Sequence, residues 1–128
     1  MFLDAAAAQA LADKILSRSK ADACAVKIDG GEDNSLRFAR GTATTNLTTS
    51  DLRLHISAHI GGRIGAVTTT QIDDYALTAA VRRSEALAAM LPVDPDYIPP
   101  PGPQDYEKPR RFHDQPEALR LDALATKA

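Results

Sequence analysis

The sequence predicts an α+β fold: two helices pack on one face of a mostly antiparallel sheet of four to five strands, and a proline-rich C-terminal tail follows. Three observations predict it. Apolar residues recur at helical spacing near both ends of the first 91 residues, and they alternate at strand spacing between these two stretches. All eight prolines come after Leu91, so nothing before that point interrupts a helix or strand.

The first helix is expected over about residues 5–19, with Asp4 as its N-cap. Its apolar residues recur every three or four positions and form one stripe, made of Ala8, Leu11, Ala12, Ile15 and Leu16. The second helix is expected after Thr70, because Thr70 and Asp73 have the spacing of an acidic capping box. Its stripe consists of Leu77, Ala80, Val81, Ser84, Leu87, Ala88 and Leu91.

Five strand segments lie between the helices. They are expected at residues 24–28, 36–39, 42–49, 52–59 and 64–69. The composition of Asp29–Asn34 predicts a turn after the first segment, and Gly61-Gly62 predicts a tight turn before the last. In the fourth segment, Leu52, Leu54, Ile56 and Ala58 face the core, while Arg53, His55, Ser57 and His59 face solvent.

The prolines also predict the domain organisation. Residues 1–91 are expected to form the folded α+β domain, residues 92–113 an extended proline-rich connector, and residues 114–128 the start of a truncated helix. Hydrophobic side chains in the connector are expected to pin it to the domain surface, and these are Tyr97, Ile98 and Tyr106.

Charge and composition exclude several classes of protein. A formal net charge of -2 argues against a nucleic-acid binder, which normally carries a basic excess. No apolar run approaches the roughly 20 residues of a membrane span, and the start of the chain lacks the basic and apolar regions of a secretory signal. A single cysteine, Cys24, cannot form an internal disulfide or a thiolate metal site. A reduced, cytoplasmic protein is therefore expected.

The histidines do not form a metal motif. His55 and His59 are four residues apart, a spacing that would bring them together on a helix. On a strand, four residues span roughly 13 Å, too far for two ligands of one ion. Both are therefore expected on the solvent face, and His113 has no partner at motif spacing.

Other candidates also have structural explanations. Gly61–Gly65 joins two strands and lacks the ending of a phosphate-binding loop. Cys24 is expected in the core, where burial raises a thiol pKa. Asp73-Asp74 suits the positive end of a helix dipole. The arginines expected on a solvated face are Arg37, Arg40 and Arg53. The sequence thus predicts no catalytic, cofactor-binding or metal-binding residue.

The Thr-rich segment Thr42–Thr49 is the most unusual strand. It offers hydroxyl groups and little apolar surface on either face. Such a strand is typical of a sheet edge with which another chain pairs, so it predicts a surface for an extended peptide or a second subunit.

Several pieces of the chain resemble the N-terminal domain of the TldD/PmbA (TldD/TldE) metallopeptidase family. These pieces are Ser35–Gly41, Asn46, Leu52–Ile56 and Gly62–Thr69, together with the Ala-rich helix through Ala88. The exit Pro92–Asp96 and the stretch Pro101–Tyr106 resemble the connector of that family and favour its PmbA-like branch. The resemblance covers roughly residues 5–106.

The resemblance implies a cytoplasmic dimer of related subunits that hydrolyses peptides and unfolded segments. In the family, zinc is bound by a His-Glu-x-x-x-His helix of a C-terminal domain that this chain lacks, so no zinc or catalytic residue is carried over and the chain alone is expected to be inactive. The expected partners are a homologous TldD/PmbA-type subunit and extended peptides, not nucleic acid or membrane. Two interpretations follow: a non-catalytic N-terminal domain of such a peptidase system, as a fragment or truncated product, or a stand-alone strand-docking interaction module.

Overall fold

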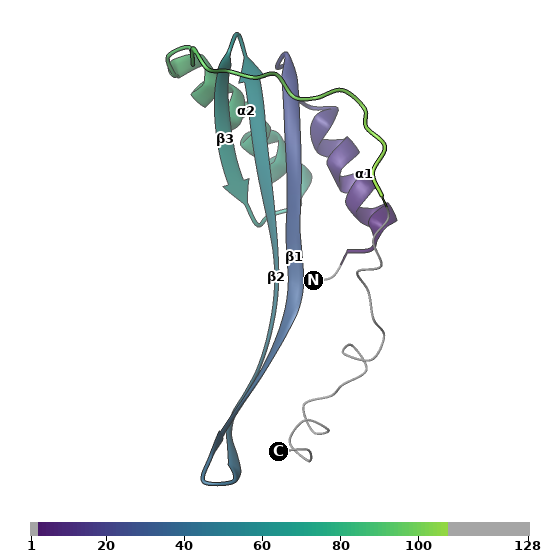
Figure 1. Cartoon of the computed structure of the whole chain (residues 1–128), viewed down its shortest axis with the longest axis vertical. Helices are drawn as coiled ribbons and strands as arrows, with labels where there is room; N and C mark the ends of the chain where they lie inside the picture. The colour runs from purple at the N-terminus through teal and green to yellow at the C-terminus, as the bar shows by residue number, and fades with distance from the viewer. Residues whose placement is uncertain (1–2, 108–128) are drawn as a thin grey trace. The chain divides into compact units, whose positions relative to one another are not determined.

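The computed structural model describes residues 3–107. In chain order the elements are α1 (Ala5–Leu16), β1 (Ala23–Ala39), β2 (Thr42–Ile60), β3 (Arg63–Thr69) and α2 (Asp74–Met90). The three strands form one sheet in the order β1-β2-β3, and Figure 1 shows the helices beside it. The predicted α+β class is confirmed, although the sheet has three strands and not four or five.

The strand count differs because predicted strands merge. The segments expected at 24–28 and 36–39 form the single strand β1, and those expected at 42–49 and 52–59 form the single strand β2. β1 runs straight through Asp29–Asn34, where a turn was expected, and Gly30 and Gly31 do not adopt the positive φ of turn glycines. The reversal comes at Arg40-Gly41, whose φ angles of 53° and 75° match a two-residue type I′ hairpin. This turn lets β1 and β2 pair along their length, and that pairing outweighs the turn-forming composition of the earlier stretch.

The core lies between the sheet and the helices. Alternate residues of β2 are buried as predicted, with exposures of 8% for Leu52 and 0% for Leu54, Ile56 and Ala58. Residues of α1, β2 and α2 form one buried cluster, made of Ile15, Leu54, Ile56, Leu77, Ala80 and Val81. Each large aliphatic side chain buried here contributes about 1.5–3 kcal/mol, so both helices are held on the same face of the sheet.

Aspartate side chains cap both helices. Asp4 Oδ1 accepts a hydrogen bond from the Ala7 N–H at 2.7 Å, as predicted, although α1 ends at Leu16 and not near residue 19. Asp73 Oδ1 accepts from the Ala76 N–H at 2.9 Å, so Asp73 is itself the N-cap of α2. The expected capping box that starts at Thr70 does not form, because the helix begins one residue after Asp73.

A glycine lets β3 and α2 approach closely. A Cβ at Gly65 would collide with the Ser84 carbonyl oxygen and with the Ala88 backbone. Ser84 and Ala88 are small and fully buried, and the Ser84 hydroxyl donates to the Val81 carbonyl at 2.8 Å. The contact therefore depends on small residues on both elements, a role for Gly65 that the turn interpretation of Gly61–Gly65 did not foresee.

The chain divides into two compact units, and the two long strands run from one into the other. The first unit contains Met1–Gly31 and Asp51–Pro101. Of the described residues, the second contains Glu32–Ser50 and residues 102–107. The boundary at residue 91 and the connector over 92–113 stay predictions, whereas the helix expected over 114–128 and His113 lie outside the described residues.

Candidate functional site

A polar network links the three strands on the sheet face opposite the helices. His55 on β2 lies at the centre, with its Nδ1 2.9 Å from Thr68 Oγ1 on β3 and its Nε2 3.1 Å from Asp29 Oδ2 on β1. Lys27 Nζ lies 3.0 Å from the same carboxylate oxygen. Because a carboxylate only accepts, Nε2–H donates to Asp29. In the neutral ring Nδ1 accepts from the Thr68 hydroxyl, whereas in the protonated ring it donates to the hydroxyl oxygen.

The charges around Asp29 stabilise its ionised form. The hydrogen bond from Lys27 is the largest favourable influence, and the charges of Lys27 and His55 add to it, so the pKa of Asp29 lies below its ordinary value. The Asp29 side chain is 46% exposed, so solvent screens these interactions.

Thr68, His55 and Asp29 place a hydroxyl, an imidazole and a carboxylate in a row. In enzymes with covalent catalysis, the same order is formed by a nucleophile, the base that activates it and the acidic residue that orients the base. Such a group is effective where water is excluded and where donors stabilise the developing charge. Here the His55 side chain is 40% exposed, and the pocket described below does not include it. Lys27 also holds Asp29, so the network is best interpreted as a link between strands. His55 is on the solvent face, as expected.

His59 is on the same face but is not exposed to solvent. Its relative exposure is 9%, because the ring of Tyr97 covers it at a centroid distance of 5.7 Å and an interplanar angle of 63°. The Tyr97 hydroxyl lies 3.1 Å from His59 Nδ1. The expectation of a solvent-facing His59 was therefore wrong, since the chain returns over the sheet after α2.

This returning segment, Leu91–Tyr97, is called the exit strap below. The Asp94 N–H donates to the Gly62 carbonyl at 3.0 Å, and Val93 Cγ1 lies 3.2 Å from the position of a Cβ on Gly62. The turn it covers is the predicted Gly61-Gly62 reversal, with φ angles of 55° and 76°. Of the three residues expected to pin the connector, Tyr97 does so, whereas Ile98 and Tyr106 are 83% and 79% exposed.

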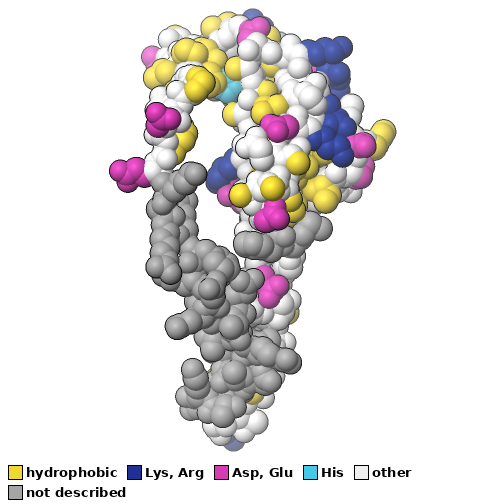
Figure 2. Space-filling model, turned by 90° about the vertical axis from the view of Figure 1, so that its right-hand side faces the viewer, with side chains coloured by type: hydrophobic (Ala, Val, Ile, Leu, Met, Phe, Trp, Pro, Cys, Tyr) yellow, Lys and Arg dark blue, Asp and Glu magenta, His cyan; other side chains and the backbone are white. Residues whose placement is uncertain are grey.

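Asp74 joins the two helices. Its Oδ1 lies 2.6 Å from Lys14 Nζ and 2.8 Å from Arg18 Nη2. Lys14 lies in the last turn of α1, and Arg18 follows the helix. The hydrogen bond from Lys14 is the main reason that the pKa of Asp74 is lowered. In Figure 2, Lys and Arg side chains gather on the helical side of the first unit. Asp74 therefore does more than complement the dipole of α2, the role that the sequence predicted.

Glu85 makes a second, less exposed link. Its side chain, 13% exposed, accepts hydrogen bonds from the Lys20 N–H, the Ser19 hydroxyl at 3.3 Å and Arg82 at 2.9 Å. Burial by itself raises the pKa of Glu85, but these donors outweigh it and the net pKa is lowered. Glu85 therefore fastens the loop between α1 and β1 to α2.

Cys24 is a half-buried residue packed against the core. Burial raises the pKa of its thiol, the Ser19 hydroxyl opposes the shift, and the charge of Glu85 adds to it. A raised thiol pKa lowers the fraction of thiolate, so the direction predicted from the sequence is confirmed.

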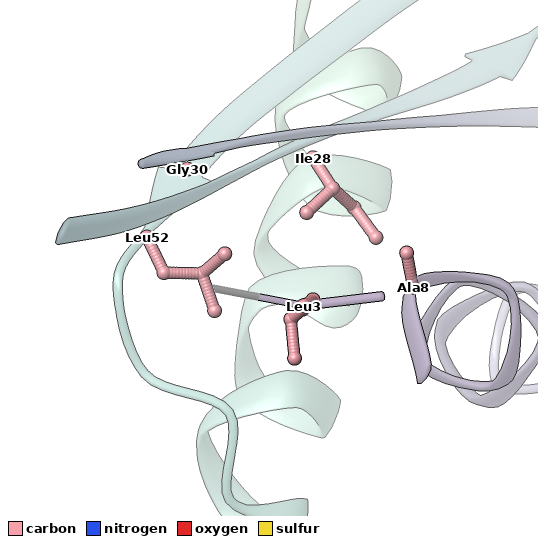
Figure 3. A pocket seen from close by; sticks show the side chains of 5 residues that line it. All are labelled: Leu3, Ala8, Ile28, Gly30 and Leu52. Atoms are coloured by element: carbon pink, nitrogen blue, oxygen red, sulfur yellow. The ribbon is translucent and has the colours of Figure 1, made fainter. Parts of the chain in front are cut away.

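A small apolar pocket opens beside the start of α1 (Figure 3). It has a volume of about 120 Å³ and is lined by Leu3, Ala8, Ile28, Gly30 and Leu52. None of these side chains carries a donor, an acceptor or a titratable group, so the side chains of the pocket offer no acid or base. Within residues 3–107, no cluster of three or more His, Cys, Asp or Glu side chains is placed to hold a metal ion. Neither α1 nor α2 has the length and apolarity of a membrane-spanning helix.

In the second unit, Glu32–Ser50 forms a two-stranded arm, called the hairpin arm below. Every residue from Phe38 to Ser50 is exposed, including Phe38 at 39% and Leu47 at 55%. Two side chains reach across the arm: Thr48 Oγ1 donates to Asn34 Oδ1 at 2.7 Å and Thr44 Oγ1 to the Arg37 carbonyl at 3.3 Å.

The Thr-rich stretch does not form a separate edge strand, because it is part of the central strand β2. However, β3 pairs with Leu54–Ile60 alone. In the described part of the chain, β2 therefore has a neighbouring strand on one side only between Thr42 and Arg53.

Comparisons with known proteins identify the fold. No family model matches the chain. No curated protein matches it either. Among solved structures, the chain is similar to TldE from Thermococcus kodakarensis, with a TM-score of 0.73 and 13% sequence identity. The match covers 90% of this chain and 26% of that one, so the chain spans about a quarter of the length of the structure that it resembles. At this identity the likeness establishes a shared fold.

Proposed function

We propose that the chain is a non-catalytic N-terminal domain of a TldD/PmbA-type zinc metallopeptidase system, as a fragment or truncated product, acting in the proteolysis of peptides or unfolded segments. The observation that carries the proposal is the TM-score of 0.73 with TldE over 90% of the chain. The sequence pieces that resemble the family's N-terminal domain support it independently, and their exit motif favours the PmbA-like branch.

The role proposed for this domain is association and not chemistry. The His55 network is open to water, and the apolar pocket has no reacting group. The proposal therefore assigns zinc binding and hydrolysis to a homologous TldD-type subunit, and places both proteins in the cytoplasm.

A peptide-hydrolysis assay tests the assignment of chemistry. Unfolded peptides are incubated with the chain alone, with a full-length TldD-type subunit, and with both, and the products are identified by mass spectrometry. The chain alone is expected to cleave nothing. Cleavage by the purified chain that is lost in His55→Ala, and retained in the exposed control Tyr75→Ala, would contradict the proposal.

The alternative is a stand-alone strand-docking module without enzymatic activity. The stretch Thr42–Ser50 of β2 favours this alternative, because it has no charged residue and, in the described part of the chain, a neighbouring strand on one side only. The DNA downstream of codon 128 distinguishes the two: an open frame encoding a Gly-rich β domain supports the peptidase system, and a clean stop followed by its own terminator supports the module.

A further inference from the structure

We propose that Gly30-Gly31 divides the long β1–β2 hairpin into two parts that open independently. The strand pairing of the hairpin arm, Glu32–Ser50, is then lost in local unfolding events that leave the first unit folded. This inference goes beyond the proposed function and does not depend on it, because it concerns the stability of one segment of the chain.

The first argument is that neither of the usual structural reasons for a glycine applies at Gly31. Its φ angle is not positive, unlike those of Gly41, Gly61 and Gly62. A Cβ at Gly31 would meet no atom within 4 Å, whereas a Cβ at Gly65 would collide with backbone. A residue with a side chain therefore fits at this position, and the effect of glycine there is to weaken the interior of a strand.

The second argument is the composition of β1 around the glycine pair. β1 is 17 residues long, and its stretch Asp29–Asn34 consists of Asp, Gly, Gly, Glu, Asp and Asn. These residue types are depleted in strands, whereas β-branched and aromatic residues are enriched. Because successive residues of a strand point to opposite faces, two consecutive glycines leave both faces without a side chain. Cross-strand side-chain pairs therefore cannot stabilise the hairpin at Gly30 and Gly31.

The third argument is that the support of the hairpin changes at the same point. The first unit ends at Gly31 on β1 and resumes at Asp51 on β2. Within it, apolar residues of β1 pack against the core, whereas Leu36 is the one residue of the arm that is not exposed. In the described part of the chain, β3 pairs with Leu54–Ile60 and not with the arm. A two-stranded hairpin without a third strand or a covering helix is at best marginally stable in water.

Side-chain hydrogen bonds link β1 and β2 on both sides of the glycine pair. In the first unit, Asp29 Oδ2 lies 3.1 Å from His55 Nε2. In the arm, Asn34 Oδ1 accepts a hydrogen bond from Thr48 Oγ1 at 2.7 Å. Among the described residues, the side-chain hydrogen bonds between these two links stay within one strand. The pairing around the glycines therefore depends on the backbone alone, so the hairpin is weakest there.

This division gives the arm a conformational role. The ends of β1 and β2 inside the first unit support the core, and the arm opens and closes without loss of that core. Elements that change conformation on binding are drawn from segments of low local stability. The arm is therefore the segment in which we expect a conformational change while the first unit stays folded.

Native-state hydrogen exchange of the purified full chain, followed amide by amide by nuclear magnetic resonance, tests the proposal. The hydrogen-bonded amides of the arm are expected to share one protection factor, at least about 100-fold lower than those of Leu54 and Ile56. The change is expected as a step at Gly30-Gly31. Simple fraying from the Arg40-Gly41 turn would instead give protection that declines gradually toward the turn.

The variant Gly31→Val supplies a β-branched side chain of the kind that strands favour. It should raise the protection of the arm amides about fivefold and leave that of the first unit unchanged. Gly31→Ala is a milder variant and should give a smaller rise in the same direction. Gly102→Val is the matched control, because a Cβ at Gly102 also meets no atom within 4 Å and Gly102 lies outside the strands. It should leave the protection of the arm unchanged.

Two kinds of result would overturn the proposal. In the wild type, arm amides as protected as those of Leu54 and Ile56, or a gradual decline without a step, would show that the glycine pair does not divide the hairpin. This measurement needs no variant to fold. Unchanged arm protection in folded Gly31→Val and Gly31→Ala would likewise show that the glycines do not set the boundary.

Discussion

The Tyr97 hydroxyl and His59 Nδ1 lie 3.1 Å apart although 38 residues separate them in the chain. Tyr97 belongs to the exit strap and His59 to the end of β2, so this contact fixes the first residues after α2 on the sheet. The strap contains Pro92 and Pro95, so the contact holds the start of the proline-rich stretch on the sheet.

Tyr97→Phe is expected to destabilise the protein by about 1 kcal/mol, the net contribution of one hydrogen bond. His59 then loses a partner at a site that is only 9% exposed. Urea unfolding followed by circular dichroism measures the change. Tyr106→Phe is the matched control, because Tyr106 is 79% exposed and its substitution should leave the free energy of unfolding unchanged. Equal effects of the two variants would show that the strap does not hold His59.

Gly65→Ala is expected to destabilise the protein by about 2–4 kcal/mol, since overpacking at a backbone contact forces β3 and α2 apart. The added Cβ would meet the Ser84 carbonyl and the Ala88 backbone, which cannot rotate away as a flexible side chain does. Thermal unfolding measures the loss. Gly31→Ala is the control, because no atom lies within 4 Å of a Cβ at Gly31. A stable Gly65→Ala would contradict the close approach of the two elements.

Acid should destabilise the protein, because several carboxyl groups have pKa values in the folded state that lie below their ordinary values. Glu85 has a pKa below its ordinary 4.5, so its contribution is fully present above that value and is lost as the pH falls through the lower folded-state pKa. Asp29 and Asp74 act in the same direction. Thermal unfolding between about pH 6 and pH 2.5 spans this window. Glu85→Gln should be less stable than the wild type at pH 6, and the difference should shrink in acid; a constant difference would exclude Glu85 as a source of the pH dependence.

Thr45→Pro should weaken the pairing of this chain with another chain, while the helix content stays nearly constant. Proline removes a backbone donor from the strand, and β2 at this position has a neighbour on one side only in the described chain. Sedimentation and far-ultraviolet circular dichroism measure the two quantities. Global unfolding of the variant would mean that Thr45 lies inside the cooperative core, and unchanged association of a folded variant would remove this segment from the interface.

Local patterns predicted the helices, the buried face of β2 and the Gly61-Gly62 turn, because each depends on residues close in sequence. Leu54 and Ile56 alternate with polar residues whatever the rest of the chain does. The uninterrupted course of β1 through Gly30 and Gly31 could not be predicted in the same way. It depends on pairing with β2, a contact that outweighs local turn composition.

The candidate site was predicted less completely for the same reason. His55 on the solvent face follows from alternation, but its links to Asp29 and Thr68 require the arrangement of three strands. The burial of His59 depends on its contact with Tyr97. The sequence indicated that Tyr97 packs on the domain, because it is an aromatic residue among prolines, but it did not indicate that His59 is the residue it covers. The close approach of Gly65 to Ser84 and Ala88 could not be predicted from the sequence. These residues lie far apart along the chain, and their contact exists only because β3 packs against α2.

The central claim is that this chain associates with a homologous TldD-type subunit, and light scattering after size exclusion tests it most directly. The purified chain and a full-length TldD-type subunit are mixed at about 10 µM each, above the dissociation constant of a stable complex. The account predicts a co-eluting complex whose mass equals the sum of the two proteins. Separate elution of both proteins at their individual masses would contradict it.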